Sequence, residues 1–120
     1  MLAALRIDNV RNVPVGRLSG EVDASNAGEL GRRLTSAVPN TAIGMVVDLC
    51  ETSYLDSSGV QLLFELADRL RRRQQRLYLI VPARSFIGDV LEAVSMGDLA
   101  RIVRSLSEAL DDLDPDGAGA

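Results

Sequence analysis

Apolar residues recur in short runs separated by polar turns, and the first two runs have the pattern of strands. They extend from Leu2 to Ile7 and from Val13 to Leu18, and the turn-forming residues between them predict a hairpin. Pro14 and Gly16 weaken the second strand, because proline lacks the N–H that a sheet ladder needs. Residues 20–23 are expected to form a loop.

The next two apolar segments predict a helix and a central strand. Ser25 or Asn26 can cap a helix that ends near Val38, and its apolar residues are spaced by three and four: Ala27, Leu30, Leu34 and Val38. The short run from Gly44 to Cys50 is typical of a strand buried on both faces. A polar link then leads to a second helix, from about Ser58 to Arg73.

The rest of the chain continues the alternation of strand and helix. We expect a strand from Arg76 to Val81, a helix from Ser85 to Val94, a short strand from Ala100 to Val103 and a helix from Ser105 to Leu113. This order predicts an α/β fold, in which about four helices pack on a mixed four- to five-stranded sheet. Residues 1–110 form one domain, and residues 111–120 a disordered acidic and Gly-Ala tail.

Composition excludes several classes of function. The chain is 47% apolar but only 3% aromatic, and its net charge of −4 argues against a nucleic-acid binder. All 13 basic residues are arginine, and the absence of lysine and histidine disfavours an enzyme, a metal site and a cofactor. The single cysteine, Cys50, cannot form an internal disulfide. No stretch is long and apolar enough for a signal peptide or for membrane insertion, so we expect a cytoplasmic protein.

The stretch Asp56-Ser57-Ser58-Gly59 lies where the central strand turns into the second helix. A helix N-terminus leaves backbone N–H groups unpaired and carries a partial positive charge. Ser58 to Gln61 fits a capping box, which would leave Ser57 just outside the helix with its hydroxyl exposed to a kinase. The alternative is that both serines only cap the helix.

Two leucines of the second helix lie off its main apolar stripe. On a helical wheel Leu62 points well away from the stripe, and Leu66 lies between Leu62 and the stripe. These two leucines either contact neighbouring helices or present an exposed apolar strip to a partner. The carboxylates of Asp23, Asp48 and Asp56 favour capping and turn chemistry over a metal site. We expect Asp48 to lie beside a helix N-terminus or to pair with an arginine. The arginines at 69, 71, 72, 73 and 76 indicate a solvated helix end or a surface for an acidic partner.

Two stretches resemble the STAS-domain family, and within it the bacterial anti-sigma factor antagonists of sporulation and stress response. They are Leu18-Ser19-Gly20-Glu21-Val22-Asp23, and Val46 to Leu49 together with Tyr54 to Val60. The resemblance implies a STAS fold and a partner-switching regulator of transcription that is not an enzyme. In such a protein the unphosphorylated form binds an anti-sigma factor, which is a serine kinase of the histidine-kinase-like ATPase fold, and frees a sigma factor. A serine/threonine phosphatase reverses the phosphorylation.

The same resemblance implies roles for individual residues. Ser57 would be the phosphoacceptor, and Asp23 and Asp56 would shape the docking site. The helix would supply the rest of the partner contact through Ser58, Gly59, Leu62 and Leu66, although Leu62 stands where family members often have glycine. One alternative is an unphosphorylated STAS module of a transport complex, such as a lipid-transport complex. A nucleotide hydrolase is disfavoured, because the sequence has no phosphate-binding loop.

Overall fold

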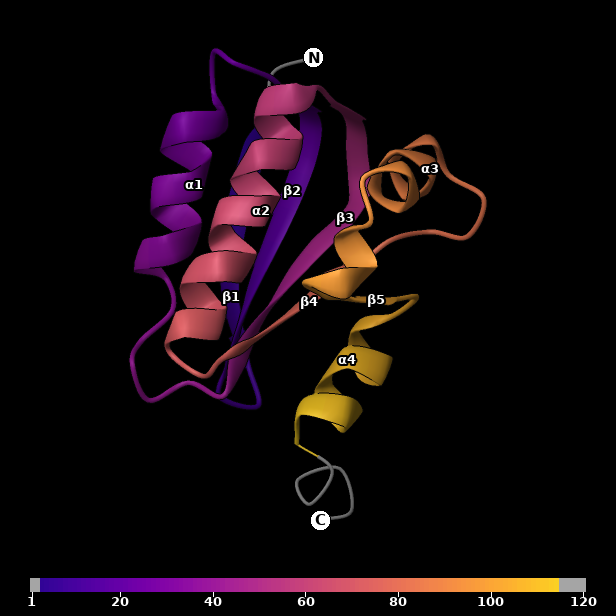
Figure 1. Ribbon diagram of the computed structural model, residues 1–120. Coiled ribbons are helices and arrows are strands. Elements are labelled where there is room, and N and C mark those ends of the chain that lie inside the picture. The colour runs from indigo at the N-terminus through magenta and orange to yellow at the C-terminus, as the bar shows by residue number, and fades with distance from the viewer. Residues whose placement is uncertain (1–2, 115–120) are drawn as a thin grey trace.

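The structure is a computed structural model that describes residues 3–114 of the chain (Figure 1). The predicted strands and helices are present in the predicted order, and a 3₁₀ helix, η1, is an addition that the sequence pattern did not indicate. The elements are β1 (Ala4–Val10), β2 (Val13–Val22), α1 (Ala27–Ser36), β3 (Gly44–Leu55), α2 (Ser57–Arg72), β4 (Arg76–Ile80), α3 (Phe86–Ala93), η1 (Met96–Asp98), β5 (Arg101–Val103) and α4 (Leu106–Leu113).

The strands within residues 3–114 form one five-stranded sheet in the order β1-β2-β3-β4-β5. β1 pairs antiparallel with β2, and every other neighbouring pair is parallel. The predicted mixed sheet with an antiparallel hairpin at its edge is therefore confirmed. Since β2 and β3 run in parallel, their carboxyl ends lie at the same edge of the sheet, and α1 and α2 both begin there.

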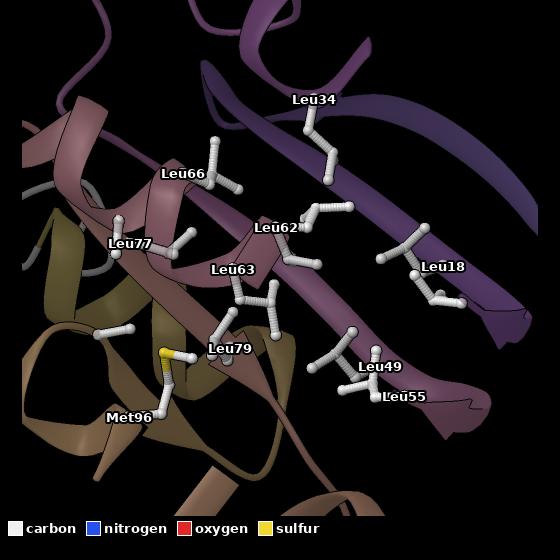
Figure 2. Packing of buried hydrophobic residues seen from close by; sticks show 14 of the residues in the cluster. Leu18, Leu34, Leu49, Leu55, Leu62, Leu63, Leu66, Leu77, Leu79 and Met96 are labelled. Carbon is white, nitrogen blue, oxygen red and sulfur yellow. The ribbon is translucent and has the colours of Figure 1, made fainter. Parts of the chain in front are cut away.

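Helices cover the two faces of the sheet unequally. α1, α2 and α3 pack on one face and form the larger core, which includes Leu34, Leu63 and Leu91. In Figure 2 the labelled leucines of α1 and α2 converge over those of the strands. α4 packs on the opposite face in a smaller core with Val46 and Tyr78. Among residues 3–114, no helix other than α4 packs on that face of the sheet.

β2 and β3 are longer than predicted, because their polar ends pair with each other. The expected loop at residues 20–23 is strand as far as Val22, and the expected polar link at residues 51–55 continues β3 to Leu55. In the parallel register Val22 lies opposite Leu55, with shifts along the way. Ladder hydrogen bonds satisfy the backbone of these segments, and so their side chains need not be apolar.

Burial of the central strand on both faces is confirmed only for its first half. Met45 to Val47 and Leu49 are fully buried, whereas Cys50 is exposed. The core under α4 contains Val46 but no later residue of β3. Cys50 is therefore exposed because α4 covers only the start of the strand.

The two residues that weakened the second strand both have a structural explanation. Pro14 pairs with Asn9 of β1, and parallel pairing with β3 starts only at Val15, so proline lies where one neighbour is missing. Gly16 leaves room for α1, since a Cβ there would come within 2.5 Å of Leu34 Cδ2.

The predicted start of the tail at residue 111 is wrong, because α4 extends to Leu113. Asp111 pairs with Arg11 at 3.1 Å, and the Tyr78 hydroxyl donates a hydrogen bond to Asp112. These contacts attach the end of α4 to the sheet layer. The rest of the predicted tail, residues 115–120, lies outside the described residues. None of the helices between residues 3 and 114 has the length and apolar character needed to cross a bilayer.

Gly44, the first residue of β3, provides a test of the packing. A Cβ there would lie 2.3 Å from the backbone oxygen of Arg76, whereas a Cβ at Gly97 would meet nothing within 4 Å. We predict that Gly44→Ala lowers the free energy of unfolding by about 1–3 kcal/mol. The matched control Gly97→Ala should change it by less than about 0.5 kcal/mol. Urea unfolding measures both, and equal effects would contradict this packing.

Candidate functional site

The candidate site lies where β2 and β3 end side by side. The backbone N–H of Asp56 donates to the carbonyl oxygen of Val22 at 3.2 Å. Asp23 and Asp56 thus follow two strand ends that are joined by a hydrogen bond. The two loops therefore meet at this edge of the sheet.

Asp56, and not Ser58, is the N-cap of α2. Its Oδ1 accepts hydrogen bonds from the N–H groups of Ser58 at 2.8 Å and Gly59 at 3.1 Å. The predicted capping box is wrong, since the Gln61 side chain donates to Glu65 at 3.0 Å instead of reaching back. Aspartate caps a helix as well as serine does, and the extended backbone at Asp56 places its carboxylate over the first turn.

This cap changes the position of both serines. Ser57 is the first residue of α2 and Ser58 the second, so neither lies outside the helix. Capping therefore does not distinguish the two hydroxyls, but exposure does: Ser57 is exposed and Ser58 is half-buried. Within residues 3–114, neither hydroxyl makes a hydrogen bond. Ser57 is thus the more accessible acceptor for a group-transfer reaction.

Gly59 is buried, and the partner contact predicted for it stays a prediction. A Cβ at this position would come within 2.7 Å of Leu55 Cδ2 and 3.3 Å of the Val22 oxygen. The missing side chain lets the first turn of α2 lie against both strand ends. Gly59 therefore positions the serines.

The exposed apolar strip predicted for Leu62 and Leu66 is wrong. Their exposed fractions are only 6% and 2%, and both belong to the main core. The alternative contact with a neighbouring helix is confirmed, because a Cβ on Gly31 of α1 would lie 3.5 Å from Leu62 Cγ. Both leucines lie at the base of a groove of about 470 Å³ between α1 and α2. The position of α1 explains the difference, since one helix alone does not reveal its neighbour.

Asp23 organises the loop that borders the site. It accepts hydrogen bonds from the Oγ of Ser25 at 2.5 Å and from its backbone N–H at 2.9 Å. These bonds, the hydroxyl first, lower the pKa of Asp23 below its ordinary value. The half-exposed carboxylate therefore stays charged at neutral pH and adds negative charge beside α2.

Asp48 does not join the other two carboxylates. Its Oδ2 lies 3.3 Å from a guanidinium nitrogen of Arg17, which confirms the predicted arginine partner. The same guanidinium lies 3.3 Å from Asp8 and is the main cause of that carboxyl's lowered pKa. No group of acidic, histidine or cysteine side chains among residues 3–114 is arranged to hold a metal ion.

The arginine cluster lies at the far end of α2 from Ser57. Arg71 and Arg72 pair with Asp68 at 3.2 and 2.9 Å. Arg73 donates a hydrogen bond to the carbonyl oxygen of Val38 at 3.3 Å. These contacts fit the solvated helix end that the sequence indicated, and they do not extend to the serines.

Pattern reasoning missed an aromatic pair beside the site. The rings of Tyr54 in β3 and Phe86 in α3 stack with centroids 6.4 Å apart and an interplanar angle of 6°. Their exposed fractions are 43% and 57%. One signal was present in the sequence, because Tyr54 follows three polar residues.

Cys50 is exposed but poorly nucleophilic. Burial of part of the thiol, followed by the hydrogen bond and charge of Asp48, raises the pKa of Cys50 to about 11. The thiol is therefore protonated at neutral pH.

The raised pKa predicts slow alkylation of Cys50. Its reaction with iodoacetamide should accelerate as pH rises toward about 11, because only the thiolate reacts. Asp48→Asn should shift this pH profile downward, since it removes the neighbouring negative charge. A profile with its midpoint near the ordinary thiol value of about 8.5 would contradict the assignment.

The cap assignment predicts different costs for two neighbouring substitutions. Asp56→Ala should lower the free energy of unfolding by about 1 kcal/mol, because two N–H groups lose their acceptor. Ser58→Ala should be nearly neutral, and Asp56→Asn should retain most of the stability. Chemical denaturation of the three variants tests this order. A larger loss of unfolding free energy in Ser58→Ala than in Asp56→Ala would contradict the cap assignment and favour the capping box.

Solved structures with the same fold include several anti-sigma factor antagonists. One from Mycobacterium paratuberculosis aligns with a TM-score of 0.78 at 19% identity, over 93% of this chain and 94% of that chain. SpoIIAA in its unphosphorylated form aligns with a TM-score of 0.70 at 22% identity, over 91% of this chain and 96% of that chain. The phosphorylated form of the Bacillus protein gives the same TM-score of 0.70 and identity of 22%, over 92% and 99%.

At these identities the structural likeness establishes the fold. No curated protein sequence matches the chain. The STAS domain family matches residues 4–109, which include the whole sheet and the Asp56–Gly59 turn. The chain therefore belongs to the STAS-domain family and has the fold of its anti-sigma factor antagonists.

Proposed function

We propose that this chain is an anti-sigma factor antagonist whose partner is selected by phosphorylation of Ser57. The observation that carries the proposal is the exposed hydroxyl of Ser57 at the start of α2, which makes no hydrogen bond within residues 3–114. A kinase requires a hydroxyl that it can reach without unfolding its substrate. The STAS fold shared with anti-sigma factor antagonists supports the same role.

A phosphate on Ser57 alters the charge of this surface and leaves the fold intact. It adds about −1.5 to −2 charges at neutral pH. The positive end of the α2 dipole offsets part of this charge, while the carboxylates of Asp23 and Asp56 oppose it. Since Asp56 already caps the helix, the phosphate is not needed to stabilise the first turn.

Like-charge repulsion explains why the phosphorylated form would leave the kinase. After transfer, the kinase still holds the phosphates of the nucleotide next to the new phosphoserine. Two sets of negative charges at short range in a site that excludes water repel each other strongly. The unphosphorylated form lacks this repulsion, so it binds the anti-sigma factor and displaces the sigma factor.

The chain acts in this cycle as a substrate. A kinase of the histidine-kinase-like ATPase fold adds the phosphate, and a metal-dependent serine/threonine phosphatase removes it. Both enzymes and the sigma factor act in the cytoplasm. The part of the antagonist that they recognise is the turn at Asp56 and Ser57 with its bordering loops.

The decisive test is phosphorylation by an anti-sigma factor kinase from the same organism. With ATP, mass spectrometry should find one phosphate on Ser57 in the wild-type chain and in Ser58→Ala, and none in Ser57→Ala. In binding measurements Ser57→Ala should retain kinase affinity, and Ser57→Asp should lose at least about tenfold, because its added charge meets the nucleotide phosphates.

The same measurements separate this role from its main alternative. If no phosphate is found and the two Ser57 variants bind alike, the switch is refuted. Constitutive binding, as in an unphosphorylated module of a transport complex, would then be the better description. Phosphate on Ser58 in place of Ser57 would refute the choice of acceptor but keep the switch.

A further inference from the structure

Tyr54 and Phe86 form an exposed aromatic pair beside the turn that carries Ser57. We propose that this pair is the anchor on which a basic surface of the Ser57 kinase docks, with an arginine or lysine side chain over a ring face. The inference rests on the proposed function and identifies a contact that the phosphate does not control.

The exposure of the pair is unusual for this chain. It has two tyrosines, two phenylalanines and no tryptophan. Tyr78 is buried and Phe64 packs against the core, yet Tyr54 and Phe86 are 43% and 57% exposed. Their rings stack with centroids 6.4 Å apart, and the exposed fractions show that the stack leaves a large part of each side chain in contact with solvent. Rigid aromatic side chains of this kind supply much of the binding energy at interfaces.

Tyr54 lies within the reach of an interface of standard size centred on Ser57. Tyr54 precedes Ser57 by three residues, so their Cα atoms are at most about 11 Å apart in a fully extended chain. A standard interface buries about 800 Å² on each partner, which corresponds to a disc of about 16 Å radius. Figure 1 shows α3, which begins at Phe86, beside the end of β3.

The charges around the pair define the chemistry of the partner. Glu51 precedes Tyr54 on β3, and Asp89 lies one helical turn after Phe86; both carboxylates are exposed. The cation nearest to Phe86 in the sequence is Arg84, which lies before the start of α3. Exposed aromatic faces on segments that also carry exposed carboxylates attract arginine or lysine through both the ring and the charge. This complementarity selects a basic surface over a purely apolar one.

The pair and the phosphate act on different parts of the kinase. Ser57 faces the nucleotide, whereas the aromatic pair lies beside it and meets the surrounding protein surface. Phosphorylation therefore weakens one contact and leaves the other unchanged. Substitutions at Ser57 and Phe86 should multiply in their effects on affinity, as independent sites do.

The test measures the affinity of the full chain for the purified kinase that phosphorylates Ser57. Phe86→Ala should weaken binding at least about tenfold, and Phe86→Leu, which keeps apolar area but removes the ring, about fivefold. Ile43→Ala is the matched control, since Ile43 is 46% exposed and precedes β3 at its opposite end. It should change the affinity by less than about twofold. Thermal unfolding of all variants confirms that they are folded.

Each result bears on a separate step of the inference. Wild-type affinity in Phe86→Ala, or an equal loss in Ile43→Ala, overturns the anchor. Wild-type affinity in Phe86→Leu overturns the proposed contact between a kinase cation and a ring face. In either case phosphorylation of Ser57 and the Ser57→Asp effect stand, and the proposed function survives. Absence of phosphate together with equal binding of the two Ser57 variants refutes the proposed function and the anchor with it.

Discussion

Parallel pairing of β2 with β3 up to their last residues is the interaction on which the site depends. Val22 lies opposite Leu55, and the N–H of Asp56 continues the pairing by one further hydrogen bond to Val22. This bond fixes the residue at which α2 can begin. A slip of one residue would reverse the faces of the strand and bury the wrong side chains. The position of Ser57 is therefore set by the sheet, and a rigid element presents it.

The same packing limits what a partner can contact. The second and third turns of α2 bury Leu62 and Leu66 against α1, where Gly31 allows a close approach. The exposed surface at this end of the molecule includes the first turn of α2, the loop at Asp23 and the aromatic pair. In the proposed function a partner would meet this surface, and a phosphate on Ser57 would change the charge at its centre.

The order and type of the elements followed from the sequence because apolar spacing reports which faces are buried. The ends of the strands did not follow from the sequence, since residues 51–53 are polar and the segment receives its backbone partners from β2. The cap was misassigned because serine and aspartate are equally good caps, and the register of β3 decides between them. The stacking of Tyr54 on Phe86 joins two segments distant in sequence, and only the packing of α3 beside β3 brings them together.

Under the proposed switch, the site would change its charge while the cap of α2 stays in place. Asp56 holds the first turn of α2 through two hydrogen bonds, and the hydrogen bonds from Ser25 keep Asp23 ionised at neutral pH. Both carboxylates already accept hydrogen bonds in the unphosphorylated chain. In the proposed switch, a phosphate on Ser57 would therefore add to a potential that is already negative. The helix N-terminus offsets only about half an elementary charge. In the proposed switch, the phosphate would therefore leave a strongly anionic patch, and partners would be discriminated by electrostatics without a conformational change in this chain.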